Sequence, residues 1–130
     1  NKSKPFIYTS ALPRILIHDA TKRFESKRER NRKKLWKNIK KFSAGLKKMG
    51  FNVNSGSQIL PIIIGKEKIT LAFGDYLFKN GIFAQPIRYP TVPRNYARIR
   101  ISITARLTDE HIEKSLSVLE NAKKKFRLNN

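Results

Sequence analysis

The sequence predicts an α+β fold in which helices cover one face of a small antiparallel or mixed sheet. Apolar residues recur at helical spacing in three stretches, and they alternate strictly or run together in others, as strands do. These stretches follow one another in the order helix, strand, helix, strand, strand, helix, which is typical of an α+β layer. With 130 residues, 39% of them hydrophobic, the chain can form one modest core.

The first predicted helix carries an apolar stripe beneath dense positive charge. Residues 13–26 either begin this helix or lead into it. Glycine reaches the left-handed conformation that closes many helices, so Gly50 is the expected end. The stripe has the spacing of one face of an amphipathic helix, and it consists of Leu35, Ile39, Phe42 and Leu46, with Trp36 beside it.

The middle of the chain predicts a strand, a helix and a second strand. Residues 52–56 read as a polar loop, and residues 58–64 as a buried strand. Apolar spacing predicts a helix over residues 66–80, stopped by Gly81. Residues 82–87 are then expected to form a strand.

Strict alternation predicts the last strand over residues 98–105. Because successive side chains point to opposite faces, the isoleucines share one face and the arginines share the other. The last helix is expected to start at Thr108, whose hydroxyl can cap it. Acidic residues in the first turn interact favourably with the positive end of the helix dipole. Its apolar stripe is Ile112, Leu116 and Leu119, with Phe126 as an extension.

Charge is the one compositional extreme, with a formal net charge of +20 and a pI near 10.7. Such an excess suits nucleic acid, anionic lipid or an acidic protein, but the favoured explanation is a solvated helix face that carries the residue bias of a lysine- and asparagine-rich proteome. The absence of cysteine excludes disulfides and thiolate chemistry. No apolar run is long enough to cross a bilayer or to form a signal peptide, so a cytoplasmic setting is expected. His18 and His111 lack partners at metal-ligand spacing, so no metal is expected.

A stiff turn precedes the last strand. Pro90 and Pro93 fix their own φ angles and push the residues before them towards extended conformations. A guanidinium on such a rigid base, Arg98 or Arg100, can bind a carboxylate through two parallel hydrogen bonds. From the pattern alone, however, both arginines are solvated strand residues.

Four segments in order change that interpretation. They are Phe6-Ile7-Tyr8-Thr9-Ser10-Ala11-Leu12-Pro13, Ser57 to Gly65, Gly81-Ile82-Phe83, and Ile87-Arg88-Tyr89-Pro90-Thr91-Val92-Pro93 with the strand after it. Together these segments resemble the α-oxoamine synthases, pyridoxal-phosphate enzymes that condense an amino acid with an acyl thioester. The resemblance implies the C-terminal domain of a fold-type I pyridoxal-phosphate transferase.

The resemblance assigns roles to four residues. Arg100 and Thr91 would bind the amino-acid substrate, while Thr9 and Ser10 would bind the cofactor phosphate across a homodimer interface. The sequence departs from the family pattern at Arg14, residues 94–96 and Leu107. These departures weaken the assignment of fine specificity more than the assignment of the fold.

The family's Schiff-base lysine lies upstream of the segment that starts at Phe6. Residues 1–26 are therefore expected to link to a cofactor domain outside this chain, residues 27–130 to form the small domain, and the chain alone to be inactive. The favoured branch is the 8-amino-7-oxononanoate synthases of biotin biosynthesis, which use alanine. The glycine acetyltransferase and aminolevulinate synthase branches are alternatives, with an acyl-CoA or an acyl-carrier protein as donor and no membrane partner. A basic RNA-binding module is the alternative of another class, although no base-recognition motif is present.

Overall fold

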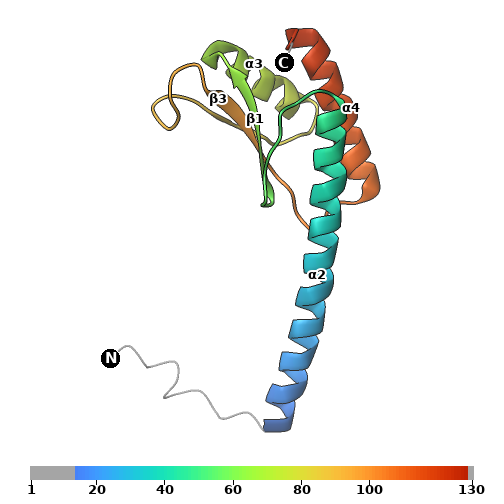
Figure 1. The fold of residues 1–130 in the computed structure, drawn as a ribbon. Coiled ribbons are helices and arrows are strands. Elements are labelled where there is room, and N and C mark those ends of the chain that lie inside the picture. The colour runs from blue at the N-terminus through green and yellow to red at the C-terminus, as the bar shows by residue number, and fades with distance from the viewer. Residues whose placement is uncertain (1–13, 129–130) are drawn as a thin grey trace, which may run out of the picture. The chain divides into compact units, whose positions relative to one another are not determined.

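The computed structural model describes the backbone of residues 14–128 and the side chains of residues 21–128 (Figure 1). The chain divides into two compact units, residues 1–32 and 33–130, and the contacts that follow lie within the second. Helix α2 spans Arg14–Lys48, so the residues after Pro13 begin the helix rather than lead into it. That residues 1–26 serve as a link to a cofactor domain stays a prediction.

Gly50 closes helix α2, as predicted, two residues beyond the helix's last residue, Lys48. This glycine has a φ of +81°, and its N–H donates to the carbonyl of Lys47 at 2.9 Å. The N–H of Phe51 reaches back to the carbonyl of Leu46 at 3.0 Å, which completes the paired bonds of a Schellman motif. The predicted stripe is also confirmed, because Ile39, Phe42 and Leu46 are buried.

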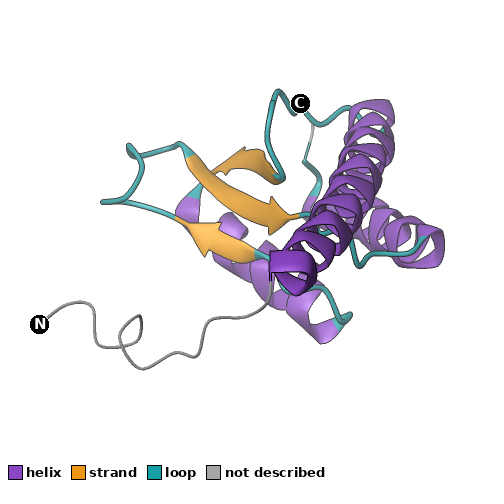
Figure 2. Ribbon diagram, turned by 90° about the horizontal axis from the view of Figure 1, so that it is seen from below, coloured by secondary structure: helices purple, strands orange, loops and turns teal. Residues whose placement is uncertain are grey.

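Three antiparallel strands form the sheet in the order β1-β3-β2: β1 is Ile59–Gly65, β2 is Gln85–Ile87 and β3 is Ala97–Ser102. Helix α3, Glu67–Lys79, lies along one face (Figure 2). Pro86 and Ile99 reach it near Gly74, where a Cβ would be in ordinary contact with both, at 3.4 and 3.5 Å. The opposite face of the sheet stays open, as the exposed Arg100 and Ser102 show.

The prediction that β1 is a buried strand was wrong for most of its residues. Leu60 and Ile62 are buried against the helices, but Ile59 and Ile63 are 38% and 42% exposed. The reason is that β1 lies at the edge of a sheet covered on one side only. The proline at position 61 fits an edge strand, because proline cannot donate to a further ladder.

Both other strands are shorter than predicted. Strand β2 starts at Gln85 rather than Ile82, because the N–H groups of Gly81 and Ile82 close helix α3, bonding to Phe78 at 3.0 Å and Leu77 at 2.9 Å. Strand β3 ends at Ser102 rather than Ala105. Beyond it the chain turns away, and the carbonyl of Thr104 accepts a hydrogen bond from a side chain of α2.

Helix α4, Asp109–Phe126, begins at its predicted cap. The hydroxyl of Thr108 accepts from the N–H of His111 at 3.2 Å, and Nδ1 of His111 accepts from the N–H of Thr108 at 3.3 Å. This reciprocal pair is a capping box. His111 therefore has a structural role at the helix start.

Helix α4 packs beside residues 33–48 of α2 (Figure 1). The helices approach closely at Gly45, where a Cβ would lie 2.4 Å from Cδ1 of Leu116. Lys41 forms ion pairs across this contact, with Asp109 and with Glu113, both at 2.9 Å. Of the helices in the described part of the chain, none is long and apolar enough to cross a membrane.

The Lys41 ion pairs predict a small pH-dependent contribution to stability. The hydrogen bonds that Lys41 donates to Glu113 and Asp109 raise its pKa above 10.5, so its contribution is present below that pH and is lost as pH rises through the folded pKa. The hydrogen bond from Lys41 lowers the pKa of Asp109 below 3.8, so that contribution is present above pH 3.8 and is lost as pH falls through the folded pKa.

We therefore expect Lys41→Gln to lower the melting temperature slightly between pH 3.8 and 10.5. The difference from wild type should shrink outside that window, and also in high salt, because all three side chains are solvent-exposed. Thermal unfolding across pH measures it. A difference that persists unchanged at pH 2 would contradict the ion-pair explanation.

Candidate anion site on the open sheet face

The turn between β2 and β3 is held by its own hydrogen bonds. The N–H of Val92 donates to the carbonyl of Arg88 at 3.4 Å, and the N–H of Tyr96 donates to that of Pro93 at 3.1 Å. The Arg94 guanidinium lies 5.2 Å from the centre of the Tyr89 ring, within cation–π range. The turn is therefore braced at both ends, as the two prolines predict.

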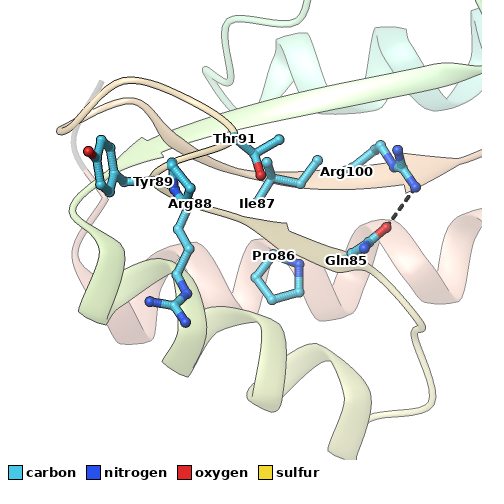
Figure 3. Close-up of a pocket in the computed structure, with 8 residues that line it drawn as sticks. Gln85, Pro86, Ile87, Arg88, Tyr89, Thr91 and Arg100 are labelled. Atoms are coloured by element: carbon cyan, nitrogen blue, oxygen red, sulfur yellow. Dashed lines mark hydrogen bonds between the residues drawn. The ribbon is translucent and has the colours of Figure 1, made fainter.

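A cavity of about 360 Å³ lies between this turn and the sheet, lined by residues 85–91 and Arg100 (Figure 3). Its charged residues are Arg88 and Arg100, and none of the described residues that line it is acidic. The side chain of Arg88 extends away from that of Arg100. The cavity therefore suits an anion, with Arg100 as the cation fixed on the sheet.

Arg100 sits in the middle of the central strand. Its neighbours Ile99 and Ile101 are buried, which anchors the backbone, while its own side chain is exposed on the open face. Across the sheet it is paired with Pro61 of β1 and Gln85 of β2. Nη2 of Arg100 donates to Oε1 of Gln85 at 2.6 Å (Figure 3).

Arg98 shares the open face but not the cavity. It is half-buried, and its Nε donates to the carbonyl of Tyr96 at 3.3 Å. The predicted alternation along β3 is thus confirmed, and the two arginines are distinguished by their partners. Arg98 holds the turn to the strand, whereas Arg100 faces the cavity.

The structure brings together two of the four residues singled out from sequence. Arg100 and Thr91 line the same cavity, and both are exposed. Thr9 and Ser10 lie outside the described residues, so their role stays a prediction. Sequence reasoning missed Gln85, because only the register of β2 against β3 places it opposite Arg100.

Comparison with known proteins places the chain in a family. The sequence profile of aminotransferase class I and II matches residues 1–119. This chain belongs to the aminotransferase class I and II family. Within this family, the 8-amino-7-oxononanoate synthase of Treponema denticola is 38% identical over 129 residues, and that of Bacillus subtilis is 35% identical over 131. The match covers 97% and 98% of this chain but 33% of either relative, so the chain spans about a third of their length.

Solved structures of this family share the fold. The 8-amino-7-oxononanoate synthase of Francisella tularensis matches with a TM-score of 0.66 and 26% identity, over 91% of this chain and 35% of that one. The serine palmitoyltransferase of Sphingomonas wittichii matches with a TM-score of 0.71 and 26% identity, over 76% of this chain and 26% of that one. The predicted fold class, the α+β C-terminal domain of a fold-type I pyridoxal-phosphate transferase, is confirmed.

The described cavity fits a carboxylate better than the covalent attachment of a cofactor. Pyridoxal phosphate is held in its enzymes by a Schiff base with a lysine. None of the described residues that line this cavity is a lysine. Its guanidinium, hydroxyl and amide groups instead match the hydrogen-bonding needs of a substrate carboxylate.

Proposed function

We propose that this chain is the C-terminal part of a pyridoxal-phosphate acyltransferase that condenses an amino acid with an acyl thioester and releases carbon dioxide. The 8-amino-7-oxononanoate synthase reaction is the first choice, and the glycine acetyltransferase and aminolevulinate synthase reactions are alternatives. One observation carries the proposal. In a chain 38% identical to a named synthase over nearly its whole length, the Arg100 guanidinium lies in a cavity whose described lining has no acid.

In this proposal Arg100 binds the carboxylate of the amino acid and Thr91 contacts the substrate from the turn. Thr9 and Ser10 bind the cofactor phosphate across a homodimer interface. When bound, pyridoxal phosphate supplies an electron sink for the carbanion that attacks the thioester. The role of this chain is to position the amino acid, because binding at the carboxylate fixes one end of the substrate before the reaction begins.

The partners follow from the same proposal. The amino acid is alanine or glycine, and the acyl donor is an acyl-CoA or an acyl-carrier protein. The cytoplasmic location predicted from the sequence stays a prediction.

A chimera tests the proposal directly. The part of the Treponema denticola relative that this chain does not match is joined to this chain, and the product is assayed with alanine and a pimeloyl thioester. We expect 8-amino-7-oxononanoate to form, with glycine and acetyl-CoA as the poorer pair. Cofactor absorbance shows whether the chimera has assembled. An assembled chimera that makes no product from any of the family's substrate pairs would overturn the proposal.

The 130-residue chain by itself should not form a Schiff base with the cofactor at one specific lysine, because no described lysine lines the cavity. When pyridoxal phosphate is added to the chain, we expect an aldimine absorption band no stronger than the band given by the same concentration of free lysine. Borohydride reduction followed by peptide mass spectrometry measures this. A single lysine modified stoichiometrically would contradict the expectation.

A further inference from the structure

We propose that Gln85 is a positioning residue, whose neutral side chain fixes the Arg100 guanidinium and leaves its charge available to a carboxylate in the cavity. The identity of that carboxylate rests on the proposed function. The positioning itself rests on the geometry of the two side chains.

The geometry is that of a directly opposed cross-strand pair. Gln85 faces Arg100 in the β2–β3 register, and Nη2 of Arg100 donates to Oε1 of Gln85 at 2.6 Å (Figure 3). Such opposed residues have their Cβ atoms about 5 Å apart, close enough for their side chains to interact. The backbone beneath is fixed, because the adjacent pair Pro86 and Ile99 packs against helix α3. An exposed arginine without such a partner would sample many rotamers.

The neutrality of the partner has a consequence for binding. A carboxylate at position 85 would pair with the guanidinium through two charge-assisted bonds and cancel its charge. The amide oxygen of Gln85 instead accepts from Nη2 alone, and a guanidinium has five N–H donors. Arg100 therefore keeps its charge and most of its donors for a ligand.

The other neighbours of Arg100 do not compete for those donors. On β1 its cross-strand partner is Pro61, whose side chain has no hydrogen-bonding group. In the described part of the chain, no acidic residue lines the cavity. The Gln85 amide NH₂ also remains a donor, so the pair can offer a cation and a neutral donor side by side.

The first test needs no enzymatic activity. In the 130-residue chain, the side-chain NMR signals of Arg100 report its rotation, and titration with sodium acetate at constant ionic strength reports anion binding. We expect Gln85→Met, which keeps length but loses the acceptor, to free the guanidinium and weaken acetate binding several-fold. Gln85→Glu should keep the guanidinium fixed but weaken acetate binding at least tenfold. Gln58→Ala, an exposed glutamine just before β1, is the matched control and should change neither.

The second test separates this inference from the proposed function. In the chimera, Gln85→Met should raise KM for alanine three- to tenfold, and Gln85→Glu more, with KM for the acyl donor unchanged. If Arg100→Ala impairs the chimera while both Gln85 variants leave KM for alanine within twofold, the inference is overturned and the function stands. If the wild-type chimera assembles but makes no product from any of the family's substrate pairs, the function fails, and the NMR and acetate measurements alone decide the role of Gln85.

Discussion

Replacing Arg100 by alanine in the chimera should raise KM for alanine about 100- to 1000-fold and slow turnover, because the loss of two charge-assisted hydrogen bonds to a carboxylate has effects of that order. The cavity lining offers no equivalent replacement, since the side chain of Arg88 points elsewhere (Figure 3). Steady-state kinetics with alanine as the varied substrate measures the effect. KM for the acyl donor should stay nearly unchanged, which localises the loss to the amino-acid site.

Two matched variants make the result interpretable. Arg100→Lys keeps the positive charge but loses the planar fork, so its KM for alanine should fall between those of wild type and Arg100→Ala. Arg98→Ala removes the neighbouring arginine, which bonds to the carbonyl of Tyr96 outside the cavity lining. It should lower stability and leave KM for alanine close to wild type. Near-normal kinetics for Arg100→Ala would remove Arg100 from the substrate site.

The helices were predictable because their signals are local. Each signal lies within a few residues of the helix that it marks: an apolar stripe at helical spacing, a glycine after the last turn or a threonine before the first. Gly50, Gly81 and Thr108 accordingly close or cap the helices where the sequence indicates. The alternation along β3 is local in the same sense, and it placed Arg100 on the open face correctly.

The strand ends and the partner of Arg100 were not predictable because they depend on distant residues. Strand β2 begins only at Gln85, because the N–H groups of Gly81 and Ile82 donate to carbonyls of α3 and cannot pair with a strand. The register that sets Gln85 opposite Arg100 is fixed across an intervening turn, and no pattern within either strand specifies it. Sequence alone therefore singled out Arg100, but not the glutamine that accepts its hydrogen bond.

Asn38 is a second residue whose role only the structure shows, and replacing it should have a large effect on stability. It lies in α2 and is only 4% exposed, a rare burial for an asparagine. Its Nδ2 donates to the carbonyls of Thr104 and Leu107, at 3.0 and 3.1 Å. These two bonds hold the connection between β3 and α4 against α2.

We expect Asn38→Ala to lower the free energy of unfolding by about 2 kcal/mol, because it removes two hydrogen bonds and leaves two partly buried carbonyls without that donor. For a domain of this size that corresponds to a drop of roughly 8 to 16 °C in melting temperature. Urea and thermal unfolding followed by circular dichroism measure it.

The matched control is Asn121→Ala on the exposed face of α4. It makes the same chemical change within a helix but removes no hydrogen bond to the β3–α4 connection. Because alanine is the better helix former, by roughly 0.6 kcal/mol, this variant should be unchanged or slightly more stable. The difference between the two variants then isolates the bonds to Thr104 and Leu107. If Asn38→Ala unfolds with the same free energy as Asn121→Ala, those bonds do not fix the connection, and the start of α4 must be held by its capping box and by the ion pairs of Lys41.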